Sequence, residues 1–251
     1  MAYDNNAFCW HGVISTDLDG AKAFYTEVLG WKIAEVDMGD DVATMFAAGG
    51  VNQAHLMAPP MPGVPSHVSN YLRVQDIDAS TAACAAAGGA VVVPVTDIPV
   101  GQFSVVTSPS GATLSLFHEA DEATAKNADG GDGTFHWVEL HSTDLEADRA
   151  WAEAAFGFEV SEMPMPEGTY YVLSAGGAMR GGIMKGMHPG APSMWLAWVE
   201  QSDVDATAER VKNNGGKLLT PLMDMDGIGR MAIAQAPDGA VFGVITPAKK
   251  G

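Results

Sequence analysis

The chain has 251 residues, enough for one large domain or two of ordinary size, and its 47% of hydrophobic residues excludes a disordered chain. With 31 acidic and 13 basic residues the formal net charge is −18, which repels phosphate backbones and anionic lipid, so we expect neither nucleic acid nor a membrane as partner. Two cysteines are too few for a disulfide framework, and the N-terminal residues lack the pattern of an export signal. We therefore expect a cytoplasmic protein.

The first predicted elements are a strand, a helix and about three further strands. An apolar stretch runs into Asp17-Leu-Asp, and the next segment ends at Gly30. Aspartate at the start and glycine at the end are typical caps of a helix. Short β-like runs follow, for example Ala43-Thr-Met-Phe. The apolar face of the helix is formed by Leu18, Ala21, Tyr25, Val28 and Leu29.

The same pattern recurs three more times along the chain. Asp76, Asp144 and Asp203 again stand between an apolar stretch and a helix-like segment that ends in glycine. Successive capping aspartates within each half are 59 residues apart, and the two halves repeat at an offset of 127 residues. Four units of strand, helix and three strands are therefore predicted.

Residues 118–134 separate the two halves. They contain almost nothing apolar and three glycines close together, which is the composition of a linker. We therefore predict a first domain at residues 1–118, a linker at 119–134 and a second domain at 135–251, with two units in each domain.

The opening and closing motifs of these units resemble a known superfamily. Asp17-Leu-Asp, Phe24-Tyr and Leu29-Gly-Trp open the first unit, and Ser-Pro-Ser-Gly and Ala-Pro-Asp-Gly close the second and the fourth. In four tandem copies they resemble the vicinal oxygen chelate superfamily, which contains glyoxalase I, the bleomycin-resistance proteins and the extradiol dioxygenases. The resemblance implies an α+β fold in which paired βαβββ units curl into two half-open barrels, each around a cavity. Within the superfamily, tryptophan at positions 10 and 137 makes the chain look most like tandem two-barrel proteins that are often labelled hydroxylases.

The alternation along each first strand predicts which side chains face a cavity. Four residues before each capping aspartate the residue is aliphatic, so this parity is expected to pack on the helix. The opposite parity supplies aromatic and ionisable side chains, as a small-molecule pocket requires. The candidate substrate-binding residues are Trp10, Tyr71, Arg73, Trp137 and Trp198. The alternatives are a core role for the aromatic rings and a solvated rim position for Arg73.

Metal-binding members of the superfamily hold a divalent ion with His, Gln or Glu from the first and last strands, which the resemblance implies here as well. The corresponding first-strand positions are Trp10, Ser69, Trp137 and Leu196. The last-strand positions are His55, Ser115, Gly182 and Gly243. One imidazole in eight places is no chelate, so we expect no metal and no other cofactor. A divalent metal is the main alternative, because a register shift of two residues would place Glu139 among the ligands.

Glu139 is the candidate general base. A carboxylate in the middle of a strand either contacts a ligand, a metal or a charge partner, or is desolvated so that its pKa rises. His141 and His55 are the other candidate catalytic residues. The first hypothesis is an enzyme of the superfamily, such as a lyase, isomerase or oxygenase, acting on a small oxygenated organic molecule without the usual metal.

Two other functions remain open at this point. One is a non-catalytic protein that binds and sequesters a small molecule such as a cationic drug, which the net charge of −18 and the aromatic walls would suit. The other is an interaction protein with vestigial pockets. In each case the chain is expected to be a monomer or a homodimer.

Overall fold

The computed structural model describes residues 4–37, 42–121, 130–165, 168–187 and 190–249. The elements of the first half are β1 (Phe8–Ile14), α1 (Leu18–Leu29), β2 (Lys32–Asp37), β3 (Val42–Ala48), β4 (Val51–Met57), β5 (His67–Arg73), α2 (Ile77–Ala86), β6 (Ala90–Ile98), β7 (Gly101–Thr107) and β8 (Thr113–Glu119). Those of the second half are β9 (Phe135–Ser142), α3 (Leu145–Phe156), β10 (Glu159–Met165), β11 (Gly168–Ala175), β12 (Ala178–Lys185), β13 (Met194–Glu200), α4 (Val204–Asn213), β14 (Lys217–Leu218), β15 (Met223–Met225), β16 (Gly229–Gln235) and β17 (Val241–Pro247).

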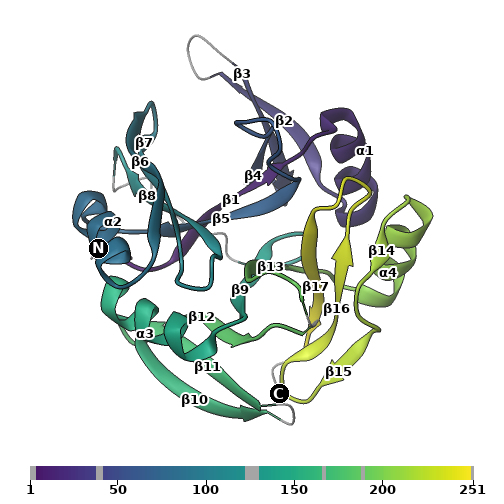
Figure 1. Cartoon of the computed structure of the whole chain (residues 1–251). Coiled ribbons are helices and arrows are strands. Elements are labelled where there is room, and N and C mark those ends of the chain that lie inside the picture. Colours follow the sequence, from purple (N-terminus) through teal and green to yellow (C-terminus); the bar gives the residue numbers. More distant parts are fainter. Residues whose placement is uncertain (1–3, 38–41, 122–129, 166–167, 188–189, 250–251) are drawn as a thin grey trace. The chain divides into compact units, whose positions relative to one another are not determined.

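The strands form two sheets, one from each half of the sequence (Figure 1). The first has the order β2-β3-β4-β1-β5-β8-β7-β6. The second has the order β10-β11-β12-β9-β13-β17-β16-β14, and β15 pairs with β16. The first strand of each βαβββ-like unit runs parallel to the last strand of that unit, as in β1–β4 and β9–β12. The predicted α+β fold with four such units in two half-barrels is confirmed.

Each helix begins at the predicted aspartate. The side chains of Asp17, Asp76, Asp144 and Asp203 each accept a hydrogen bond from the backbone N–H three residues further on. These bonds satisfy one of the free donors that every helix N-terminus leaves. The first and third helices end at Gly30 and Gly157, whose φ angles of 70° and 67° lie in the left-handed region that glycine adopts without strain.

The chain divides into two compact units that do not follow its two halves. The α2–α3 unit comprises Met1–Trp10, Ser69–Asn127 and Val138–Leu196. The α1–α4 unit comprises His11–Val68, Ala128–Trp137 and Ala197–Gly251. Each unit therefore takes one helix from each half of the sequence. The domain limits at 118 and 135 stay predictions, and residues 122–129 of the predicted linker lie outside the described part of the chain.

The core of the α2–α3 unit forms where its two helices meet. Trp151 of α3 is 1% exposed and donates from Nε1 to the backbone oxygen of Cys84 at 3.2 Å. Asp148, which is fully buried, accepts hydrogen bonds from the hydroxyl of Ser142 at 2.6 Å, from the backbone N–H of Ser110 at 3.1 Å and from the Ser110 hydroxyl. A buried carboxylate is thus fully hydrogen bonded, as its desolvation requires.

The α1–α4 unit has an aromatic core. Tyr25 stacks on Trp31 with ring centroids 5.6 Å apart, and Phe46 and Phe242 contact the same ring. The α1–α4 unit has a cluster equivalent to that of Asp148, but its acidic residue lies in a turn and not on a helix. Here the hydroxyl of Ser15 donates to Asp238, in the turn before β17, at 2.5 Å.

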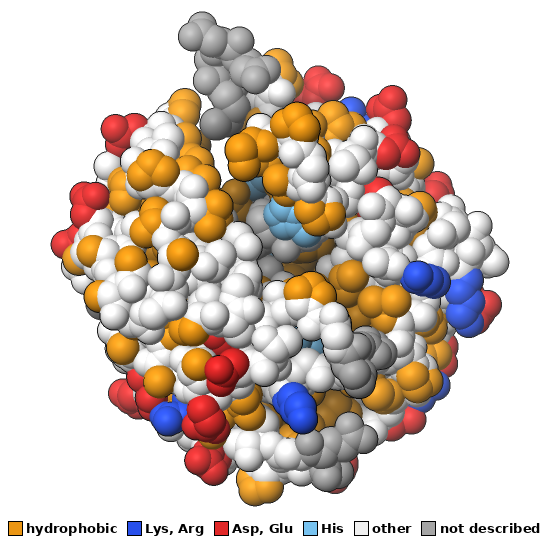
Figure 2. Space-filling view, viewed as in Figure 1, with side chains coloured by type: hydrophobic (Ala, Val, Ile, Leu, Met, Phe, Trp, Pro, Cys, Tyr) orange, Lys and Arg blue, Asp and Glu red, His pale blue; other side chains and the backbone are white. Residues whose placement is uncertain are grey.

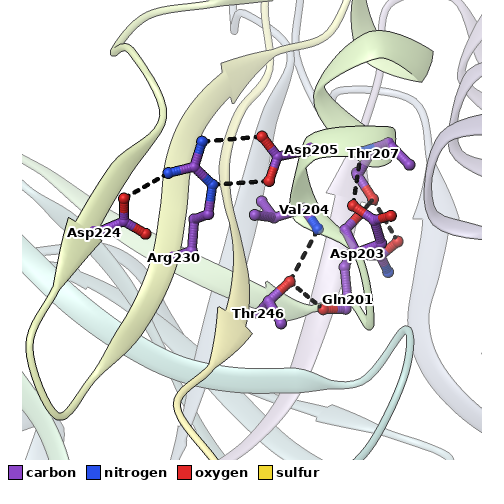
Figure 3. Close-up of polar contacts among 9 residues, drawn as sticks. Gln201, Asp203, Val204, Asp205, Thr207, Asp224, Arg230 and Thr246 are labelled. Carbon is purple, nitrogen blue, oxygen red and sulfur yellow. Dashed lines mark hydrogen bonds and ion pairs between the residues drawn. The ribbon is translucent and has the colours of Figure 1, made fainter.

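Ion pairs and capping bonds secure the start of α4 (Figure 3). Arg230 of β16 donates from two nitrogens to Asp205 at 2.7 and 2.9 Å and from a third to Asp224 at 2.7 Å. The Thr246 hydroxyl accepts from the backbone N–H of Val204 at 2.9 Å and donates to the backbone oxygen of Gln201 at 2.7 Å. These contacts join α4 to the strands beside it.

Acidic side chains are scattered over the face shown in Figure 2, and basic ones there are few. On this face the acidic side chains do not gather into one patch. None of the helices in the part of the chain that the structure describes is long and apolar enough to cross a membrane.

Candidate functional site

A cluster of three buried polar side chains lies in the α2–α3 unit. Glu139 and His141 of β9 and Tyr170 of β11 are 7%, 7% and 8% exposed. His141 Nε2 lies 2.8 Å from Oε1 of Glu139, and the Tyr170 hydroxyl donates to Oε2 of Glu139 at 2.9 Å. Both oxygens of the carboxylate are therefore engaged.

Strand register explains how the three side chains meet. Glu139 and His141 are two residues apart on β9 and so point to the same face of the sheet. On β12, Gly182 lies opposite Glu139 and Met184 lies opposite His141. Tyr170 pairs with Met184 in turn, which places all three polar side chains on one face. A Cβ at residue 182 would lie 2.5 Å from Cε1 of Tyr170 and closer still to its hydroxyl, so the tyrosine reaches Glu139 across a glycine.

The opposite face of this sheet packs on α3. Tyr171, the neighbour of Tyr170, donates its hydroxyl to Glu146 of that helix at 2.6 Å. Leu140 and Ile183, which also have this parity, are fully buried. The polar cluster thus lies on the face turned away from the helix, as the alternation along β9 predicts.

His55 lies on β4 in the other compact unit. In the sheet it pairs with Gly12 on one side and Met45 on the other. Burial lowers the pKa of His55 to about 4, so the imidazole is neutral at physiological pH. The structure does not bring His55 together with Glu139 and His141 within one compact unit.

Arg73 is held in an ion pair. It is 2% exposed, and its Nε donates to Oε1 of Glu119 at 2.6 Å. Asp4 lies 3.9 Å from another nitrogen of the guanidinium and also pairs with Arg180. Arg73 is therefore not a solvated rim residue, and its charge is compensated within the α2–α3 unit. Its role in substrate binding stays a prediction.

The predicted aromatic binding residues have different surroundings. Trp198 is 4% exposed, whereas Trp10, Trp137 and Tyr71 are half-buried. Burial raises the pKa of Tyr71, whose hydroxyl is hydrogen bonded to Ser69 and Ser115. Trp198 packs against Gly243, because a Cβ there would lie 2.8 Å from Cζ3 of the indole and closer still to two other ring atoms. Whether these rings contact a ligand stays a prediction.

Comparison with known proteins identifies the family. The model of the Glyoxalase/Bleomycin resistance protein/Dioxygenase superfamily matches residues 9–116 and again 134–244. The chain belongs to this superfamily. A protein of Mycobacterium tuberculosis named "Putative glyoxylase CFP32" is 34% identical over 247 residues, covering 95% of this chain and 94% of the relative.

More distant similarities are to a further sequence and to a solved structure. The anthracycline biosynthesis protein DauV of a Streptomyces species is 26% identical over 257 residues, covering 94% of this chain and 91% of the relative. The crystal structure of the Mn(II)-bound glyoxalase from Novosphingobium aromaticivorans has a TM-score of 0.66 at 20% identity and covers 96% of this chain and 82% of that one. The predicted superfamily membership is confirmed.

The residues of this chain do not fit the divalent metal centre that the superfamily resemblance implies. In the second sheet both last-strand positions are glycines, and the rings of Tyr170 and Trp198 occupy the space that ligand side chains from residues 182 and 243 would need. Nowhere in the described ranges are three His, Cys, Asp or Glu side chains grouped so that they could hold a metal ion.

Sequence reasoning missed Tyr170. The residue belongs to a Tyr-Tyr pair in which one side chain faces the helix and the other faces Glu139. The available signal was Gly182, because a glycine in the middle of a strand often marks the close approach of another group. Without the register of β11 on β12, that signal could not name the group.

Stability should depend on pH through His55. Its pKa of about 4 in the folded chain lies below the ordinary value of 6.5, so the unfolded chain binds more protons between these values. We expect about 3 kcal/mol of unfolding free energy to be lost as the pH falls from 7 to 4 through this residue, and His55→Gln should show a correspondingly smaller loss. Urea denaturation at both pH values measures this. His67→Gln, at the start of β5, is the control and should keep the full loss.

Proposed function

We propose that this protein transforms a small oxygenated organic molecule by acid–base catalysis at the Glu139–His141–Tyr170 cluster, without the metal centre implied by the superfamily. The observation that carries the proposal is the cluster itself, three hydrogen-bonded ionisable side chains buried on one face of a sheet. Structural cores seldom hold such groups without a use for them, since their desolvation costs stability.

The chemistry available to these groups is proton transfer. A carboxylate, an imidazole and a phenol can accept and return a proton on a carbon next to a carbonyl group, and a mostly apolar surrounding favours such transfers. Half-buried Met184 lies directly beside His141. The name of the mycobacterial relative, a glyoxylase, supports a small carbonyl compound as substrate.

The test is turnover of methylglyoxal, alone and with a thiol, and of small α-hydroxy aldehydes and ketones, by the chelator-treated protein. Glu139→Gln should lower kcat by at least about 100-fold, because it removes the carboxylate that the cluster needs for acid–base catalysis, which contributes about 10²- to 10⁴-fold. Glu162→Gln, an exposed residue of β10 in the same sheet, should leave kcat unchanged. Activity that disappears with chelation and returns with a divalent ion would contradict the proposal.

A second candidate function is binding without turnover. Two observations favour it: Trp198 offers a large, rigid ring on β13, and DauV is named for anthracycline biosynthesis. Stoichiometric binding of a ligand by both wild type and Glu139→Gln, with no product formed by either, would support sequestration instead.

A further inference from the structure

Glu139 is poorly placed to take a proton from a substrate. One of its oxygens faces His141 Nε2 at 2.8 Å, and the other accepts from the Tyr170 hydroxyl at 2.9 Å. Both oxygens of the carboxylate are thus occupied by neighbouring side chains, which fix its orientation and leave neither oxygen facing a substrate. That arrangement suits a residue that orients the neighbouring imidazole of His141.

His141 has the complementary arrangement. Nε2 faces the carboxylate, so an anionic Glu139 requires the proton of a neutral imidazole to lie on Nε2. Nδ1 makes no hydrogen bond in the part of the chain that the structure describes, and it is not among the enclosed polar atoms that lack a partner. Nδ1 is thus neither hydrogen bonded within the described residues nor fully enclosed, and it is the nitrogen left to accept a proton.

We infer that His141 is the catalytic base of this site, with Nδ1 as the proton acceptor, and that Glu139 and Tyr170 are positioning residues. This inference rests on the proposed function. Glu139 fixes the tautomer and orientation of the imidazole and stabilises the imidazolium that forms, the task a carboxylate performs beside histidine in other acid–base sites. Tyr170 fixes the carboxylate in turn.

The proton-transfer step is balanced within the site. The C–H bond next to the substrate carbonyl breaks, an N–H bond forms at Nδ1, and the electron pair stays on the substrate as an enolate. Return of that proton to a neighbouring atom of the substrate regenerates the neutral imidazole. The substrate class is accordingly a carbonyl compound with an acidic α-hydrogen.

The tautomer of His141 can be measured without a substrate. In long-range ¹H–¹⁵N correlation spectra of the full chain with ¹⁵N-labelled histidine at pH 8, comparison with His141→Gln assigns the signal. We expect a proton on Nε2 and none on Nδ1. Tyr170→Phe should broaden or shift this signal, and Tyr171→Phe, on the opposite face of β11, should leave it unchanged. A proton on Nδ1 would overturn the inference, because Glu139 would then be the donor to a bare Nε2.

Kinetics separate this inference from the proposed function. With a substrate found as above, His141→Gln should lower kcat at least about 100-fold, whereas Tyr170→Phe should lower kcat about 10-fold with little change in KM. If no substrate is turned over, the proposed function fails while the tautomer still reports the arrangement. If turnover is lost in Glu139→Gln but persists in His141→Gln, the proposed function stands and the assignment of His141 as base is overturned.

Discussion

Replacing Asp148 by alanine should lower the free energy of unfolding by about 3 kcal/mol, measured by urea or guanidinium denaturation. The change leaves three donors without their acceptor inside the α2–α3 unit, namely the hydroxyls of Ser110 and Ser142 and the backbone N–H of Ser110. Each unmet buried donor costs about 1–3 kcal/mol, and water entering the space left by the side chain would recover part of this.

The other compact unit suggests a second substitution that should restore the stability lost in Asp148→Ala. In the α1–α4 unit the residue equivalent to Asp148 is Ala21, and the residue equivalent to Ser110 is Asp238, which binds Ser15. The acidic residue is thus on the helix in one unit, as Asp148, and in the turn in the other, as Asp238. Asp148→Ala combined with Ser110→Asp should therefore recover at least half of the lost stability. A double variant no more stable than the single one would show that the two clusters are not equivalent.

Replacing Gly243 by alanine should also cost about 3 kcal/mol. The new Cβ would enter the space of the Trp198 ring, which is 4% exposed. Overpacking of this kind typically costs about 1–3 kcal/mol, and a rigid indole places the cost at the upper end. Denaturant titration of the purified variant measures the loss.

Two comparisons isolate the steric cause. Gly186→Ala is the matched control, because a Cβ at residue 186 would meet only the backbone oxygen of Ser142, at 3.6 Å, so its cost should stay below about 1 kcal/mol. In a Trp198→Leu background, Gly243→Ala should likewise cost less than about 1 kcal/mol. An unchanged cost in that background would assign the loss to the strand backbone and not to the ring.

Features set by neighbouring residues in the sequence could be predicted well. Each helix cap depends on one aspartate and a backbone N–H three residues later, and the 59-residue spacing within each half together with the 127-residue offset between the halves gives four copies of that signal. The same locality explains why Glu139 and His141 were correctly placed on one face, because alternation along a single strand decides it.

Features set by distant residues could not be predicted in this way. The partner of Glu139 is 31 residues away on β11, and its position depends on the register of two strand pairings. Arg73 is neutralised by Glu119 from another strand, 46 residues later, which strand parity alone could not reveal. The two compact units likewise depend on contacts between halves that resemble each other in sequence.

Each compact unit combines segments from both halves of the sequence, so neither half can form a complete unit by itself. A half-length polypeptide would carry α3 without α2, leaving the Trp151 indole without Cys84 and the Asp148 carboxylate without Ser110. Such a fragment could complete its interior only by pairing with a second molecule. Joining two such halves in one chain supplies that second partner permanently, and the buried acid then stands on a different element in each unit, Asp148 on α3 and Asp238 in the turn before β17.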